Sequence, residues 1–216
     1  MNSVAVQKRR PYAPRMDPEQ RREQLLDAVL RIIVTQGVHK VSIDAVAREA
    51  AVSRPVVYRL FDDSDHLLRA SLDREEAAGL AQMAEVVPRP GTGDPAQAAS
   101  DGLGRFLAAV QSAPDRWRAA FALVDSSTPT FRRRIETGRQ AFIAALTTFV
   151  RTATPPGRLD AIDIELTARA LYALYWDSGR LILTEPDTFS TERVIRFADN
   201  IIRALPAFHD HTEQDS

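Results

Sequence analysis

Apolar residues recur at intervals of three and four along most of the chain, which is the spacing of amphipathic helices. The first apolar stripe consists of Leu25, Leu26, Val29, Ile32 and Ile33. Asp17 precedes it as an expected N-cap, and Pro18 suits the first helical position. Gly37 is the expected stop. The pattern therefore predicts a helix that begins at residue 18 and ends just before residue 37.

Two short helices are predicted next, separated by a tight turn. Ser42 is an N-cap residue for a helix over 43–50, and Ser53 is an N-cap residue for a helix over 54–60. The apolar residues left to pack between them are Val52, Val57, Leu60 and Phe61. Helices this short are marginal without tertiary packing, so we expect them to rest on the first helix.

The rest of the chain also reads as helical. The polar residues 62–64 end the third helix and are expected to cap a fourth, over 65–86, before a loop rich in Pro and Gly. Further helices are predicted near 96–112, 115–125, 129–153, 160–184 and 190–205. No segment alternates as a strand does, so the predicted fold class is all-α.

Four parts follow from this pattern. Residues 17–63 form a three-helix domain, 64–86 a connecting helix, and 87–207 a larger helical domain. Residues 1–16 and 208–216 lack periodicity and are expected to be a disordered basic arm and a disordered tail. Two interpretations of the arm stay open, a segment for a DNA minor groove and a solvated terminus.

Charge is distributed unevenly, which points to a polyanion at one end. Residues 1–59 contain 11 basic and 6 acidic residues, whereas the remainder contains 17 and 23, although the net charge is only -1. Because nearly all the basic residues are arginine, one arginine by itself is a weak sign of DNA contact.

Several classes of function are excluded or disfavoured. The chain has no cysteine, which excludes disulfides, a thiolate nucleophile and Cys-ligated zinc. Gly102 and Gly104 follow no strand and lack the third glycine of a dinucleotide loop. His209 and His211 lie in the polar tail, so no metal site and no cofactor are predicted, and the protein is not expected to be an enzyme. Neither a signal peptide nor an apolar stretch of about 18 residues is present, so we expect a cytoplasmic protein with no membrane partner.

The three N-terminal helices match a helix-turn-helix module. Val57 and Phe61 brace the third helix, which leaves its other side free for DNA. Arg54 is expected to contact a guanine edge and Val56 a thymine methyl, while Tyr58 and Arg59 hold the backbone. The capped N-termini suit phosphate. The predicted DNA contacts are Ser42, Ser53, Arg54, Pro55, Val56, Tyr58 and Arg59.

Residues Val41 to Ala70, VSIDAVAREAAVSRPVVYRLFDDSDHLLRA, resemble the DNA-binding domain of the TetR (tetracycline-repressor) family of bacterial transcriptional regulators. The likeness covers about residues 18–72 and depends on several spaced positions, including the Ala50-Ala51-Val52-Ser53 turn and Val57-Tyr58-x-x-Phe61. Two positions depart from the family. Ala51 stands where members usually have glycine, and Ser64 where a lysine often touches a phosphate.

The resemblance implies a homodimer formed by the last two long helices, here near 160–184 and 190–205. Both carry apolar residues on more than one side, as helices buried against two partners do. A two-fold axis would place two recognition helices about 34–36 Å apart on a palindromic operator.

The resemblance also implies a small-molecule effector within the larger domain. The candidate pocket walls are Phe106, Trp117, Phe121, Phe142, Tyr172 and Trp176, each of which is alternatively ordinary core or dimer interface. Asp125, Asp177 and Arg180 are candidates for a polar ligand group or for surface ion pairs. The arginines at 132–134 are interpreted as a solvated helix face, with phosphate contact as the alternative.

The function predicted is a ligand-responsive, homodimeric DNA-binding regulator, a repressor that a small molecule releases from its operator. The first alternative is a small-molecule-binding or enzymatic helical protein with an incidental helix-turn-helix. The second is an adaptor that docks a protein through the same module.

Overall fold

The computed structural model describes residues 16–89, 93–124 and 129–208, and these residues form helices and no strand. The N-terminal helices are α1 (Pro18–Gln36), η1 (Val38–Lys40), α2 (Ile43–Glu49), α3 (Arg54–Tyr58) and α4 (Ser64–Val86). The others are α5 (Pro95–Ser112), α6 (Pro114–Val124), α7 (Pro129–Ala153), η2 (Pro156–Arg158), α8 (Ile164–Thr184) and α9 (Thr191–Ala204). The predicted all-α fold class is confirmed.

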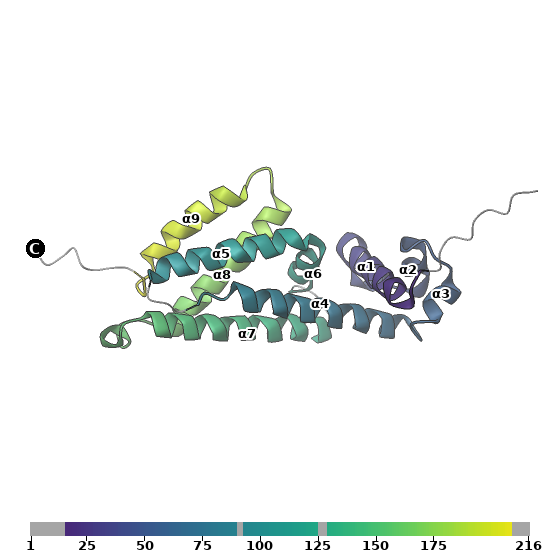
Figure 1. Ribbon diagram of the computed structural model, residues 1–216, viewed down its shortest axis with the longest axis horizontal. Helices are drawn as coiled ribbons and strands as arrows, with labels where there is room; N and C mark the ends of the chain where they lie inside the picture. The colour runs from purple at the N-terminus through teal and green to yellow at the C-terminus, as the bar shows by residue number, and fades with distance from the viewer. Residues whose placement is uncertain (1–15, 90–92, 125–128, 209–216) are drawn as a thin grey trace, which may run out of the picture.

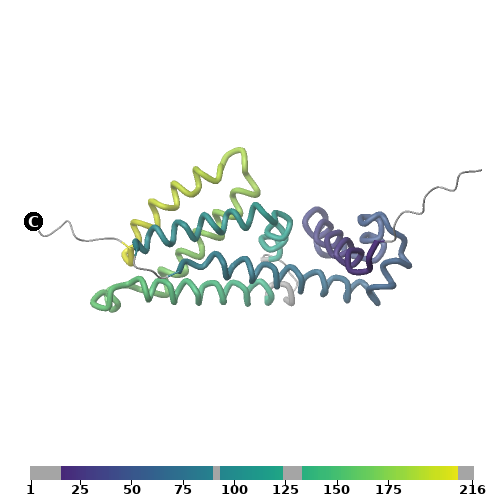
Figure 2. Tube along the Cα trace, in the orientation of Figure 1, coloured from purple at the N-terminus to yellow at the C-terminus, as the bar shows by residue number. Residues whose placement is uncertain are grey.

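The helices form two groups joined by the long helix α4 (Figure 1). Helices α1, α2 and α3 lie at one end of the molecule, and α5, α8 and α9 lie at the other. Figure 2 shows α7 running beside α4 over part of its length. Among the described residues, no helix is long and apolar enough to cross a membrane.

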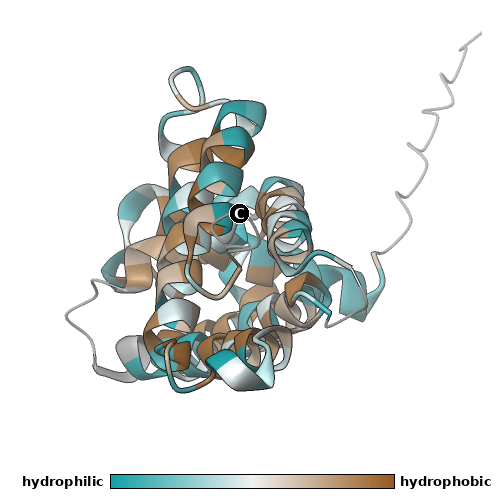
Figure 3. Cartoon of the chain, turned by 90° about the vertical axis from the view of Figure 1, so that its left-hand side faces the viewer, coloured by the Kyte–Doolittle hydropathy of each residue, from teal (hydrophilic) through white to brown (hydrophobic). Residues whose placement is uncertain are grey.

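Each group has its own hydrophobic core. The predicted stripe of α1 is buried throughout, and it packs with Val46, Val57, Phe61 and Leu67. Ala119 of α6 belongs to this same N-terminal core, so the larger domain contributes to it. The second core is formed by α5 to α9 around the fully buried Phe106, Leu146 and Tyr175. Figure 3 views the molecule from one end of its long axis and shows that the helices carry both hydrophobic and hydrophilic residues.

Several helix boundaries differ from those predicted, most of them by one residue. Helix α3 ends at Tyr58 and not at 60, and α8 begins at Ile164 and not at 160. Asp163 caps α8, since its side chain accepts a hydrogen bond from Leu166 N at 2.9 Å. Helix α4 begins at Ser64 because Asp63 is its N-cap and accepts from His66 N at 2.7 Å.

A close contact between α5 and α8 fixes the larger domain. The hydroxyl of the buried Tyr175 donates a short hydrogen bond to the carbonyl of Ala99. A Cβ on Gly102 would lie 2.7 Å from that hydroxyl, so only glycine fits there. Gly102 therefore allows α5 and α8 to pack closely. Its similarity to a dinucleotide-binding loop is limited to the residue type.

Candidate functional site

The turn between α2 and α3 is built on a left-handed residue. Ala51 has φ 53°, and its N–H donates to Arg48 O at 3.2 Å while Val52 N–H donates to Ala47 O at 2.9 Å. These two bonds form a Schellman motif, in which the left-handed position normally favours glycine. Alanine in this conformation costs about 1–2 kcal/mol relative to a right-handed one. Ala51, which stands where glycine is usual, is thus strained because the turn requires a left-handed residue at this position.

The turn presents α3 with one side packed and one side exposed. Val57 and Phe61 are buried beneath it, as predicted for the brace. The exposed side chains are Ser42, Ser53, Arg54, Pro55, Tyr58 and Arg59, and Val56 is half-buried. Ser42 accepts from Ala45 N at 3.2 Å, whereas the Ser53 side chain makes no capping bond. Six of the seven predicted DNA contacts therefore lie on α3 or directly beside it in the chain, and Ser42 lies at the N-terminus of α2.

Arg54, the predicted base contact, is paired in the free protein. Its Nε lies 2.9 Å from Oδ1 of Asp44, and both side chains are more than half exposed. An exposed pair of this kind is worth about 0–1 kcal/mol, so it yields easily to a stronger partner. Asp44 was not among the predicted site residues, because only the tertiary fold brings the first turns of α2 and α3 together.

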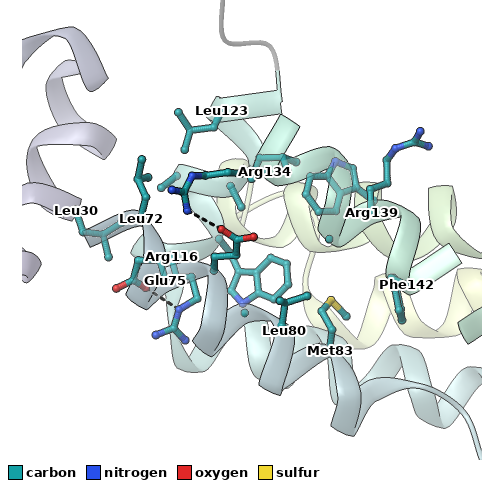
Figure 4. Close-up of a pocket in the computed structure, with 18 of the residues that line it drawn as sticks. Leu30, Leu72, Glu75, Leu80, Met83, Arg116, Leu123, Arg134, Arg139 and Phe142 are labelled. Carbon is teal, nitrogen blue, oxygen red and sulfur yellow. Dashed lines mark hydrogen bonds and ion pairs between the residues drawn. The ribbon is translucent and has the colours of Figure 1, made fainter. Parts of the chain in front are cut away.

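A second feature is a pocket of about 130 Å³ lined by residues of α1, α4, α5, α6, α7 and α8 (Figure 4). Five of the six predicted wall residues line it, namely Phe106, Trp117, Phe142, Tyr172 and Trp176. Phe121 lies outside the wall but packs edge-to-face on Trp176, with ring centroids 4.7 Å apart. Burial raises the pKa of Tyr172 to about 12, so its hydroxyl is protonated at neutral pH.

The sequence reasoning missed the walls contributed by α1 and α4. Leu30 and Ile33 of α1 line the pocket, and so do Leu72, Leu80 and Met83 of α4. Ile33 was predicted to belong to the buried stripe of the first helix, and the other four were not predicted as wall residues because the candidates were all aromatic. One available signal was that α4 carries apolar residues along most of its length although it connects two domains.

Acidic and basic side chains around the pocket are joined in pairs between helices. Glu75 of α4 binds Arg116 of α6 at 2.7 Å, and Figure 4 shows the two side chains directed at each other. Arg134 of α7 binds Asp73 at 2.6 Å and Glu76 at 2.8 Å. The hydrogen bond that Arg134 donates to Asp73 is the main cause of the raised pKa of Arg134. The interpretation of the 132–134 arginines as a solvated face is thus wrong for Arg134.

Two other polar candidates, Asp177 and Arg180, do not line the pocket. Asp177 and Arg180 of α8 are exposed and pair with each other at 2.7 Å, as the ion-pair alternative expected. Asp125 lies outside the described residues, as do His209 and His211.

The last feature is an exposed apolar surface on α8 and α9. Leu166 is 63% exposed, Phe197 64% and Ile201 41%. Ala170 and Ala173 continue the exposed face of α8. These large apolar side chains form an unpartnered face in a single chain.

A short helix, braced from below and presented after a tight turn, defines a helix-turn-helix protein of the DNA-binding class. Residues 25–71 match the family model described as bacterial regulatory proteins, tetR family. Over these residues the chain is similar to the DNA-binding domain of TetR-family transcriptional regulators.

Known proteins resemble the chain in two different ways. The nicotine-responsive transcriptional repressor HdnoR of Paenarthrobacter nicotinovorans is 35% identical over 75 residues, which are 35% of this chain and 37% of that protein. The transcriptional regulator SrpR of Pseudomonas putida is 38% identical over 56 residues, 26% of each chain. The alignments thus span about a third or less of these curated relatives.

The fold likeness covers nearly the whole molecule. A TetR-like transcriptional regulator from Rhodococcus sp. RHA1 superposes with a TM-score of 0.70 over 87% of this chain and 96% of that one, at 21% identity. At 21% identity this likeness shows the fold of the larger domain and gives no information about the chemistry of the pocket.

Proposed function

We propose that the protein is a homodimeric repressor that a small molecule releases from a palindromic operator. The observation that carries the proposal is the exposed outer side of α3, with Arg54, Tyr58 and Arg59 accessible over a buried brace. In this proposal Arg54 leaves Asp44 and forks onto a guanine edge. Tyr58 and Arg59, together with Ser42 and Ser53, hold the phosphate backbone, while Pro55 and Val56 approach the bases.

Binding to a selected and a scrambled duplex, measured by fluorescence anisotropy across a salt series, tests the DNA role. Arg54→Ala is expected to reduce the ratio of the two affinities, whereas Tyr58→Phe weakens binding to both alike. Arg118→Ala removes an exposed arginine of α6 and is the control that changes neither affinity. Equal binding of both duplexes by the unaltered protein at every salt concentration would refute the operator role.

The exposed apolar face of α8 and α9 supports the homodimer. A second copy related by a two-fold axis covers Leu166, Phe197 and Ile201 with the same face, since such an interface is self-complementary. Phe197→Glu is expected to halve the mass measured by sedimentation. Ala108→Glu adds the same charge to an exposed position of α5 and leaves the dimer intact. An unaltered chain that sediments as a 24.0 kDa monomer contradicts the proposal.

The position of the pocket supports the ligand response. Its wall includes Leu30 and Ile33 of α1, and Ala119 both lines it and packs in the N-terminal core. A ligand that binds one arrangement of α1 and α6 better than the other shifts DNA affinity by that difference. HdnoR is described as nicotine-responsive, which supports ligand control in a relative of this DNA-binding domain. If no compound that occupies the pocket changes operator affinity, the release step is wrong.

A further inference from the structure

The pocket has the size of one aromatic ring with a small substituent. Its volume is about 130 Å³, and an engineered apolar cavity of about 150 Å³ in another protein binds benzene. Leu30, Leu80, Met83 and Leu123 supply aliphatic surface on several sides (Figure 4). A ligand of this size is enclosed mainly by carbon.

Aromatic rings dominate one side of the wall and already pack on one another. Trp117 meets Phe106 edge-to-face, with centroids 5.1 Å apart and planes at 87°. Trp176 lies 5.8 Å from Tyr172 at 20° and 6.5 Å from Trp117 at 71°. Rings in such clusters prefer offset or edge-to-face neighbours, so an aromatic ligand extends the arrangement with favourable contacts.

The charged groups of the wall are satisfied before any ligand enters. Glu75 holds Arg116, and Glu76 holds Arg134. Glu75 also binds Arg74 at 2.6 Å, so both of its oxygens are engaged.

Arg139, the remaining charged residue of the wall, pairs with Glu136 at 2.6 Å. Its side chain points away from the other labelled side chains in Figure 4. Among the described wall residues, every charged group therefore has a partner.

A charged ligand faces an unfavourable choice in this pocket. It either keeps an unpaired charge among apolar side chains or takes a partner from one of the three ion pairs of the wall. All of these paired side chains are less exposed than those of the Arg54–Asp44 pair, so solvent replaces a lost partner less well. An uncharged ligand meets neither penalty. We propose that the pocket takes an uncharged aromatic molecule of about one ring and discriminates against anions and cations of the same shape. This inference rests on the ligand-binding part of the proposed function and specifies its chemistry.

Three probes of matched shape test the proposal. Acetophenone, benzoate and benzamidinium each carry a planar group of similar size on one phenyl ring, and they are neutral, anionic and cationic at neutral pH. The only two tryptophans of the chain, Trp117 and Trp176, both line the pocket. Titration of the full chain with each probe, followed by tryptophan emission and by calorimetry, therefore reports on this pocket.

We expect acetophenone to bind at least about tenfold more tightly than either ion. Binding of benzoate or benzamidinium that equals or exceeds that of acetophenone overturns the proposal. Absence of binding by all three probes overturns it as well. N-acetyltryptophanamide, titrated in parallel, corrects for direct quenching in solution.

Two glycines offer a matched pair of variants. A Cβ on Gly79 or on Gly104 meets no atom within 4 Å, but only Gly79 lines the pocket. Gly79→Leu is expected to fill the pocket and abolish acetophenone binding, whereas Gly104→Leu retains it. Both replacements raise helix propensity, so neither is expected to unfold its helix. Retained binding in Gly79→Leu, or equal loss in both variants, contradicts a ligand site in this pocket.

DNA is absent from these titrations, which separates the two proposals. Failure of acetophenone to bind refutes the ligand chemistry and leaves operator binding intact. Failure of the chain to bind a selected duplex more tightly than a scrambled one refutes the repressor role. The proposal for the ligand is then still tested by the titrations with the three probes.

Discussion

Replacement of Ala51 by glycine is expected to stabilise the protein. Ala51 occupies the left-handed region at φ 53°, which costs alanine about 1–2 kcal/mol and glycine almost nothing. Glycine loses about 0.5–1 kcal/mol through the greater freedom of the unfolded chain. Because Ala51 is exposed, the lost methyl leaves no cavity. The difference predicts a gain of about 0.5–1 kcal/mol.

Thermal unfolding at one fixed protein concentration measures this gain, since the melting temperature of an oligomer depends on concentration. For a chain of this length, 1 kcal/mol corresponds to a rise of about 2–4 °C. Ala50→Gly is the matched control. Ala50 is buried and right-handed at φ -83°, so glycine there is expected to destabilise by about 1–2 kcal/mol. A similar loss in both variants would refute the assignment of strain to Ala51.

The remaining predictions concern caps, packing and acid stability. Ser42→Ala removes the cap of α2 and is expected to cost about 1 kcal/mol in urea unfolding, whereas Ser53→Ala costs almost nothing because that hydroxyl makes no capping bond. Gly102→Ala places a Cβ 2.7 Å from the buried tyrosine hydroxyl of α8 and should lower the melting temperature by several degrees, a result that an unchanged melting curve would exclude. The hydrogen bond from Arg203 holds the pKa of Asp94 below its ordinary value, so this stabilisation is present at neutral pH and is lost as the pH falls through the folded-state pKa; Arg203→Ala should flatten the acid side of the stability profile.

The local features of this protein could be read directly from its sequence. The start and end of α1 follow from Pro18 and Gly37, although the side chain of Asp17 makes no capping hydrogen bond. The apolar stripe between them is buried as its spacing predicted. The turn before α3 was recognisable because its capping and brace residues lie within a few positions of one another. Such features depend on bonds between near neighbours, which the order of residues fixes.

The long-range features were decided by the tertiary structure. No periodicity indicates that Ala119 of α6 packs in the N-terminal core, that Asp44 holds Arg54, or that Arg134 binds α4. Each contact depends on the axial position and rotation of one helix against another, which the packing of the whole chain sets. The pocket has the same origin, because its walls come from six helices whose faces meet only after folding.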